Sequence, residues 1–442
     1  MATDTIARGL NDALQEQVER HGVPGAAAGL IVGGETHTAG VGVTHIDHPL
    51  PVTDTTLFQV GSITKTFVSA GVMLLAEEGR LSLDDPVGKH LPELAAATGI
   101  DTDAMTVEHL LSHQAGFDGD HFLVFGAGGL DRLRDARRLF EPGTGVSYNN
   151  AAFSIAGEVV AAVSGQSFEE FTAERLLRPL GIAGFFTADR AITHRVAAPH
   201  HATSESTSVL RGTGWQPGWE LARIDWAAGG LITSVDGLLK WARFQLGDGG
   251  EILSRASIER MHAPAATLDR FVSIGLDWFI IGRAHDHGGS TVGYASVLVL
   301  VPDADLAVVS LTHATTGGAV NQAIRRWALE EHAGIVERDP EPDAGITIDA
   351  SRFEGRFLSP FAQLTITPGP RPNTLTVTSS RRDDVDGWQP PPPPPMTLAF
   401  LDAEHAVTLD APTTQAWMRL GFADDGRLEW LTWNSRRAVR ND

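Results

Sequence analysis

The sequence contains no cysteine among its 442 residues. This absence excludes disulfide bonds and thiolate chemistry, although it leaves the redox compartment open. The sequence also lacks an apolar run long enough to cross a bilayer, and its first residues have neither the basic nor the apolar stretch of a signal peptide. From the sequence alone we therefore expect a soluble, cytoplasmic protein without a disulfide framework.

Basic residues are scarce relative to acidic ones, with 34 Lys and Arg against 55 Asp and Glu and a formal net charge of −21. An excess of negative charge repels nucleic-acid phosphates and anionic lipids. We therefore expect neither nucleic acid nor a membrane among the partners. Hydrophobic residues make up 42% and charged residues 20%, as in an ordinary globular protein, and the length allows two or three domains.

What the sequence does contain is a short stretch, GSITKTF at residues 61–67, at the start of a predicted helix that Gly79 ends. Ser62 then lies at the helix N-terminus and Lys65 about one turn later on the same face. A serine hydroxyl becomes a nucleophile when a neighbouring base takes its proton, and an amine can be that base if burial and positive charge lower its pKa. Alone, this pattern is more often a helix cap followed by a solvated lysine.

A second segment, residues 141–150, contains a Pro-Gly turn and leads into a predicted helix over 151–163. It carries Tyr148 and Asn150. A phenol near a lysine ammonium can lose its proton and act as a general base. An asparagine amide can bond to Lys65 and to a substrate carbonyl at the same time. In isolation, a tyrosine near a helix start is more often a packing residue.

A third segment is His287-Gly288-Gly289-Ser290, just before a predicted strand. Its two glycines allow a substrate backbone to lie close to the chain. The N–H of Ser290 can pair with that of the nucleophilic serine to bind an oxyanion. The alternative is a simple glycine-rich turn. His285 and His287 alternate as in a metal site, but no third ligand accompanies them, and we expect neither a metal nor a cofactor.

The periodicities predict an α+β architecture, in which terminal helices cover one face of an antiparallel sheet and a mostly helical subdomain is inserted into it. Three successive strands are expected over residues 273–281, 294–301 and 306–311.

A change of composition divides the chain. Residues 337–349 form a charged, proline-bearing linker between a first domain over 1–336 and a second over 350–442. The second domain has short segments that alternate with period two, which predicts a small antiparallel β-barrel. We interpret the run of six prolines at 390–395 as a stiff surface loop rather than a docking motif.

Together these motifs resemble the serine β-lactamase and penicillin-binding-protein superfamily. Ser-x-x-Lys, Tyr-x-Asn and His-x-Gly occur in this order, and the flanking phrases match as well: FQVG before Ser62, LLSHQAG at 110–116, AGGL at 228–231 and HGGSTVGY at 287–294. The resemblance covers about residues 5–335 and is nearest to class C β-lactamases, D-aminopeptidases and related esterases. The C-terminal segment is similar to the lipocalin-like domain of some of these hydrolases.

The resemblance implies a function for each motif. Ser62 is the acylated nucleophile, Lys65 and Tyr148 share proton transfer, and the His287 strand forms one wall of the cleft. The implied catalytic residues are Ser62, Lys65 and Tyr148, and the implied substrate-binding residues are Asn150, His287, Gly288, Gly289 and Ser290.

The expected activity is hydrolysis of an ester or amide bond, such as one in a peptide or next to a D-amino acid, through an acyl-enzyme. β-Lactamases and D,D-peptidases usually carry lysine where His287 stands, and a neutral imidazole attracts a substrate carboxylate less than an ammonium does. Efficient β-lactam hydrolysis is therefore disfavoured. Acyl transfer or peptide cyclisation, weak β-lactamase or D,D-peptidase activity, and non-catalytic binding are the alternatives. The expected partner is a small-molecule or peptide substrate, and a homo-oligomer is an alternative to a monomer.

Three arginines, Arg436, Arg437 and Arg440, stand near the end of an otherwise acidic chain. The favoured interpretation is a solvated basic edge that keeps the last strand from pairing with another molecule. The alternative is that one of them reaches the Ser62 cleft and clamps a substrate carboxylate, supplying the charge that His287 lacks.

Overall fold

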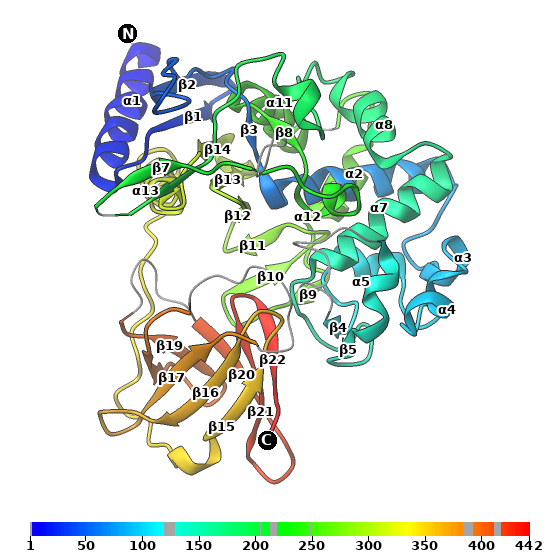
Figure 1. The fold of residues 1–442 in the computed structure, drawn as a ribbon, viewed down its shortest axis with the longest axis vertical. Helices are drawn as coiled ribbons and strands as arrows, with labels where there is room; N and C mark the ends of the chain where they lie inside the picture. Colours follow the sequence, from blue (N-terminus) through cyan, green and yellow to red (C-terminus); the bar gives the residue numbers. More distant parts are fainter. Residues whose placement is uncertain are drawn as a thin grey trace.

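The chain folds into a helix-flanked antiparallel sheet and a separate closed antiparallel barrel, which confirms the predicted fold class (Figure 1). In Figure 1 the barrel lies below the large sheet, and the inserted helices lie to the right of that sheet. No helix in the described part of the chain is both long and apolar enough to cross a membrane. The computed structural model describes residues 2–118, 129–203, 205–212, 219–247, 249–382, 392–410 and 417–442.

The large sheet has eight strands in the order β2-β1-β14-β13-β12-β11-β10-β9, and neighbouring strands are antiparallel. Both of its faces are covered, which explains why β14 is buried along its whole length. The strands are β1 (Gly25–Val32), β2 (Glu35–Gly42), β9 (Ala266–Thr267), β10 (Val272–Ile274), β11 (Phe279–Ile281), β12 (Ala284–Thr291), β13 (Tyr294–Val301) and β14 (Leu306–Thr312).

The predicted single strand over 273–281 is wrong, because a turn divides it into β10 and β11. At this turn Asp277 has a φ of 74°, a left-handed conformation that interrupts a strand. The structure also places His287 and its glycines within β12, a strand that the prediction of three strands omitted. Glycines and polar residues give a weak strand signal, so neighbouring strands decide this conformation.

Helices cover the two faces of the sheet in different ways. The terminal helices α1 (Ala2–His21) and α13 (Gly317–Ala333) pack on one face. The other face packs on α11 (Val235–Leu246) and the helical subdomain. The remaining helices are η1 (Gly61–Ile63), α2 (Thr64–Glu77), α3 (Val87–His90), α4 (Leu94–Thr98), α5 (Val107–Leu111), η2 (Leu130–Asp135), α7 (Asn150–Ser164), α8 (Phe168–Thr172), η3 (Ala173–Leu177), α9 (Ala188–Ala191), η4 (Arg223–Asp225), α10 (Trp226–Gly229), α12 (Arg255–His262), η5 (Pro302–Ala304) and η6 (Ala350–Arg352).

Short two-stranded ribbons lie outside the large sheet. They are β3 (Phe58–Gln59) with β8 (Ile232–Thr233), β4 (Phe117–Asp118) with β5 (Arg137–Arg138), and β6 (His200–Ala202) with β7 (Thr207–Val209).

The C-terminal barrel closes because its first and last strands pair. It has its own apolar core, as expected for a small eight-stranded barrel whose interior is filled by side chains. Pro392–Pro395 precede β18, whereas residues 390–391 of the proline run lie outside the described residues. The strands are β15 (Gly355–Leu358), β16 (Gln363–Pro368), β17 (Thr374–Ser380), β18 (Met396–Phe400), β19 (His405–Thr408), β20 (Trp417–Phe422), β21 (Leu428–Trp433) and β22 (Arg436–Arg440).

The β21–β22 hairpin docks the barrel on the first domain (Figure 1). Asn434 and Ser435 form its turn with φ values of 49° and 61°, the left-handed pair that a tight hairpin turn requires. The carbonyl of Ser435 accepts the N–H of Tyr148 at 2.9 Å. The Ser147 hydroxyl accepts the N–H of Arg437 at 3.0 Å. The hairpin therefore holds the segment that carries a predicted catalytic residue.

Candidate active site

Ser62 and Lys65 come together as their spacing predicts. Ser62 lies in η1, directly before α2, and is partly exposed, whereas Lys65 in the first turn of α2 is fully buried. The Lys65 Nζ lies 3.0 Å from the Ser62 Oγ and donates to the carbonyl of Ala228 at 2.5 Å. These two oxygens fix the amine beside the serine, in a position to exchange a proton with it.

Tyr148 lies over the amine. The Lys65 Nζ is 5.0 Å from the centre of its ring, and the Tyr148 side chain is buried. Asn149 caps α7, since its Oδ1 accepts the N–H of Ala152 at 3.0 Å. Asn150 is the first residue of α7 and is partly exposed. The structure thus brings Tyr148 to the Ser62–Lys65 pair and places Asn150 one residue beyond the cap.

Glycines allow η1 and β12 to approach closely. A Cβ atom on Gly61 would lie 2.7 Å from the backbone nitrogen of Ser290, and Gly61 has a φ of +55°. A Cβ atom on Gly289 would lie 2.0 Å from the carbonyl oxygen of Val60 and 3.0 Å from the nitrogen of Ser62. Because side chains cannot fit here, the backbone nitrogens of Ser62 and Ser290 stay near each other, as an oxyanion site needs.

β12 has an edge at which an extended ligand can pair. Its residues 287–291 pair with β13, whereas its pairing with β11 ends at Asp286. Gly288 and Ser290 are exposed, and Gly289 is partly exposed. A strand edge of this kind can bind an extended peptide through main-chain hydrogen bonds.

The imidazole of His287 is buried behind this edge, with 1% of the side chain exposed. Its Nδ1 lies 2.7 Å from the carbonyl oxygen of Gly288, and its Nε2 lies 3.1 Å from the Oδ2 of Asp277. The predicted contact of the His287 ring with substrate is not tested by this geometry and stays a prediction.

Two further residues belong to the site although the sequence did not predict it, His113 and Asp277. Both are fully buried, and the Nε2 of His113 lies 3.2 Å from the Oδ1 of Asp277. The ring of His113 is 4.3 Å from that of Tyr148. His113 belongs to the segment LLSHQAG at 110–116, which the resemblance noted without assigning it a role, and no pattern in the sequence points to its partner, 164 residues away.

Charge and burial set the protonation of this pair. Burial lowers the pKa of His113 and outweighs the opposite effect of Asp277. Burial alone would raise the pKa of Asp277, but the charge of His287 and the hydrogen bonds from both histidines bring it below its usual value. Asp277 is therefore a carboxylate, and His113 is neutral.

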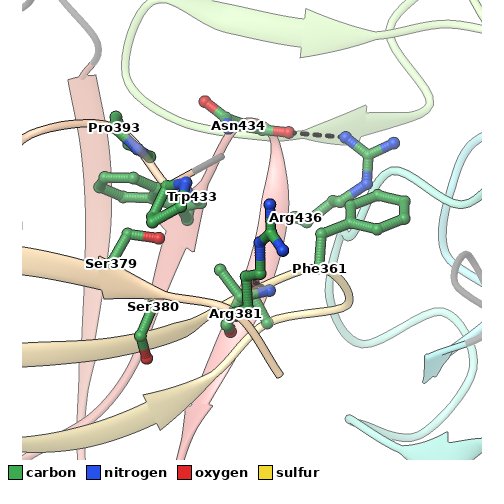
Figure 2. A pocket seen from close by; sticks show the side chains of 11 residues that line it. Phe361, Ser379, Ser380, Arg381, Pro393, Trp433, Asn434 and Arg436 are labelled. Carbon is green, nitrogen blue, oxygen red and sulfur yellow. Dashed lines mark hydrogen bonds between the residues drawn. The ribbon is translucent and has the colours of Figure 1, made fainter. Parts of the chain in front are cut away.

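A cavity of about 120 Å³ lies at the end of the barrel and is lined only by barrel residues, Arg436 among them. Figure 2 shows Arg381, Arg436, Phe361 and Trp433 among the residues that line it, with the Arg436 guanidinium beside the ring of Phe361. The guanidinium of Arg436 lies 4.8 Å from the centre of the Tyr148 ring. Its Nη1 donates to the carbonyl of Asn434 at 3.1 Å.

The other two arginines of the hairpin have structural contacts. The guanidinium of Arg437 lies between the rings of Phe140 and Trp430, at 4.4 and 3.8 Å from their centres, and burial lowers its pKa to about 10. Arg440 donates to the carbonyls of Leu428 and Glu354 at 2.6 and 3.0 Å. Arg436 is thus the arginine of the three whose guanidinium contacts Tyr148.

Among the described residues, no group of three or more His, Asp or Glu side chains is arranged to hold a metal ion.

Comparisons with known proteins give matches over most of the chain. The family profile described as Beta-lactamase matches residues 10–333. Penicillin-binding protein 4 of Amycolatopsis lactamdurans is 30% identical to this chain over 375 residues, which cover 78% of this chain and 95% of that protein.

Solved structures share the whole fold. SurE has 23% identity and a TM-score of 0.75, and the match covers 98% of this chain and 99% of that chain; SurE has also been solved with D-Leu. The octameric penicillin-binding protein homologue from Pyrococcus abyssi has 21% identity and a TM-score of 0.65, with 98% and 99% coverage. At these identities the likeness shows that the sheet, the helices and the barrel are arranged alike.

Proposed function

This chain belongs to the β-lactamase family, and from its site we propose that it is a serine hydrolase that cleaves an ester or amide bond through an acyl-enzyme on Ser62. The observation that carries this proposal is the 3.0 Å contact between the Ser62 Oγ and the Lys65 Nζ. A buried amine beside a partly exposed hydroxyl is what an activated serine nucleophile needs. The ring of Tyr148, 5.0 Å from the same nitrogen, adds a second group for proton transfer.

The proposed reaction has two halves. The Ser62 Oγ attacks the substrate carbonyl carbon, and its proton passes to the Lys65–Tyr148 pair. The backbone N–H groups of Ser62 and Ser290 stabilise the oxyanion. Tyr148 returns the proton to the leaving alcohol or amine as the C–O or C–N bond breaks, which leaves the acyl group on Ser62. Water then attacks the ester with the same groups acting as base, and the acid and free Ser62 are regenerated.

The proposed substrate bears a carboxylate near the scissile bond. Arg436 supports this part of the proposal, because its guanidinium lies 4.8 Å from the Tyr148 ring and lines the cavity in Figure 2. A guanidinium at the edge of a partly apolar cavity can bind a carboxylate through two parallel hydrogen bonds. The adjacent rings of Phe361 and Trp433 suit an apolar side chain.

Acyl transfer to an amine, including cyclisation of a peptide, is the second candidate. The cavity in Figure 2 favours it, because an acceptor bound there would contact Arg436, whose guanidinium also lies 4.8 Å from the ring of Tyr148, the residue that would remove the acceptor's proton. An amine that is bound there attacks the same acyl-enzyme in place of water. Since SurE shares the fold and was solved with D-Leu, D-Leu is a suitable first acceptor to test.

Intact-mass spectrometry tests the proposal. The wild-type protein, exposed to a fluorophosphonate and to a panel of esters with and without a carboxylate, should gain one adduct. Ser62→Ala should gain none and should turn over no ester, while its melting temperature stays close to that of the wild type. Ser290→Ala is the matched control, because it keeps the backbone N–H and should still be labelled. An adduct of undiminished yield on Ser62→Ala would refute the assignment of Ser62.

A further inference from the structure

Left-handed backbone is concentrated around Tyr148. Non-glycine residues rarely adopt positive φ, and surrounding contacts must hold them there. His113 and Asp277, with φ of 58° and 74°, are fully buried and bonded to each other, and the turn at Asn434 and Ser435 bonds to Tyr148. Strained residues cluster at functional sites. The described non-glycine residues with positive φ are His113, Asp277, Asp305, Asn373, Asn434 and Ser435.

His113 holds the backbone on both sides of Tyr148. Its carbonyl oxygen accepts the N–H of Ser147 at 3.0 Å, and its Nδ1 accepts the N–H of Asn149 at 3.1 Å. An amide N–H can only donate, so the Nδ1 carries no proton and the Nε2 does. The Nε2–H then points at the Oδ1 of Asp277, 3.2 Å away. Asp277 therefore fixes the tautomer and the orientation of the ring that holds Tyr148.

His287 supplies the opposite charge on the other side of Asp277. The carbonyl of Gly288 can only accept, so the Nδ1 of His287 carries a proton. The Nε2 of His287 and the Oδ2 of Asp277 lie 3.1 Å apart, and neither atom forms a regular hydrogen bond with any of the described residues, so this close contact is the one polar approach that the two atoms have there. Two lone pairs facing each other at this distance in a buried site would repel, so a proton lies between them. The pair is then an imidazolium and a carboxylate.

We propose that Asp277 is a positioning residue for Tyr148, acting through His113, and that His287 is the cation that balances the charge of Asp277. This assigns His287 a function other than contact with substrate. The inference rests on the proposed function, because it takes Tyr148 to be a base. The charged and titratable groups around Tyr148 are then Lys65 from α2, His113 after α5, Asp277 between β10 and β11, His287 from β12 and Arg436 from β22.

A purely structural role would make different demands on position 277. The left-handed backbone there favours glycine, which would relieve the strain at no cost if only the turn mattered. The buried carboxylate instead requires two partners and a balancing cation.

Three variants separate the charge from the hydrogen bonds. His287→Gln leaves the charge of Asp277 unbalanced, which hinders the loss of the phenolic proton of Tyr148. The ascending limb of the pH profile of kcat/KM should therefore move upward by about one unit. Asp277→Asn keeps an acceptor for His113 and removes both the carboxylate and the need for a cation to balance it, so the ascending limb of this variant should stay in place. The double variant should bring the limb back to the wild-type position. The proposal would be overturned if the ascending limb of His287→Gln did not move. It would also be overturned if the limb of the double variant, His287→Gln with Asp277→Asn, were displaced as far as that of His287→Gln alone.

Two further variants complete the test. Asp277→Gly removes the partner of His113, and it should lower kcat by a factor of about 10² while KM changes little. Wild-type kcat in Asp277→Gly would show that only the turn matters. His287→Lys keeps the cation opposite Asp277, so the ratio of activity on carboxylate-bearing and neutral esters should not change. A rise in this ratio would instead mean that residue 287 meets substrate.

Nitrogen NMR of ¹⁵N-labelled histidines gives a readout that needs no activity. The wild-type spectrum should contain the signal of one doubly protonated imidazolium, which should be missing in His287→Gln. It should also contain one neutral Nε2-protonated ring, that of His113. A neutral His287 in the folded wild type would refute the inference even if Ser62 is labelled. A failure to label Ser62 would refute the proposed function while leaving this assignment of protons standing.

Discussion

At the scale of single residues, a buried lysine is the most informative feature of the site. Burying an ammonium is costly unless it has polar partners. Lys65 is fully buried, and the Ser62 Oγ and the Ala228 carbonyl lie within hydrogen-bond distance of its Nζ. A lysine that only stabilised the fold would be better placed with its amine in water. Its position is explained if the amine exchanges protons with Ser62.

Lys65 and Tyr148 should act as one unit. Lys65→Ala and Tyr148→Phe should each lower the rate of acylation by about 10²–10⁴, the usual range for general acid–base groups. The double variant should be little slower than either single variant, because residues on one proton path do not contribute independently. Burst-phase kinetics with a chromogenic ester measures this rate. Losses that multiply in the double variant would show that the two residues serve separate proton paths.

The sequence could predict the approach of Ser62 to Lys65 because a helix fixes residues three positions apart. The positions of His113 and Asp277 could not be predicted in the same way. Their contact joins residues 164 apart, and left-handed backbone is uncommon for any residue other than glycine, so no local pattern predicts it. Tertiary contacts therefore decide this part of the site.

At the scale of elements, the β21–β22 hairpin links the barrel to Tyr148, one of the proposed catalytic residues. The carbonyl of Ser435 in its turn accepts the N–H of Tyr148. Arg436, the first residue of β22, has its guanidinium over the Tyr148 ring. The buried Arg382 at the end of β17 lies 3.6 Å from the buried Asp118 of β4, which adds a second link between the two domains. The barrel is thus joined to the first domain beside the site.

The three arginines of this hairpin should differ in kinetics. Arg436→Ala should raise KM for carboxylate-bearing esters and spare neutral ones, because it alone removes a guanidinium next to Tyr148. Arg440→Ala is the matched control on the same strand, and it should change neither, since Arg440 bonds to barrel carbonyls. Steady-state kinetics on paired esters decides. Wild-type KM values in Arg436→Ala would leave the hairpin a purely structural role.

The barrel itself was predictable, because alternation with period two marks its strands. The division between β10 and β11 was not, since a single residue at Asp277 causes it. Nor did the sequence indicate which of the three arginines faces the site, because that depends on the register of β22 against β21.

At the scale of the whole molecule, buried neutral histidines should make the fold sensitive to acid. Burial lowers the pKa of His262 to about 3, with a smaller effect from His285, and lowers that of His313 to about 3, with a smaller effect from His200. The unfolded chain binds these protons near pH 6.5. The stability that these groups contribute is therefore present above pH 6.5 and is lost as the pH falls toward 3.

His262→Phe should reduce this acid sensitivity. Removal of one proton uptake on unfolding lowers the slope of the unfolding free energy by about 1.4 kcal/mol per pH unit between about pH 6 and 4. Urea denaturation at several pH values measures the slope. His48→Gln is the control, because His48 is exposed. A slope in His262→Phe equal to that of the wild type would mean that His262 takes up no proton when the chain unfolds.

The bond between Ser435 and Tyr148 also has a consequence for the order of biosynthesis. A ribosome makes the chain from its N-terminus, and domains generally fold as they emerge. The nascent first domain can assemble its sheet and bring Ser62 to Lys65 while residues 434–437 have not yet been translated. During that interval the Tyr148 amide lacks the carbonyl that holds it in the finished protein. If Ser62 and Tyr148 act as proposed, catalytic competence is thereby coupled to translation of the barrel, and a truncated translation product would carry the proposed nucleophile without the carbonyl of Ser435.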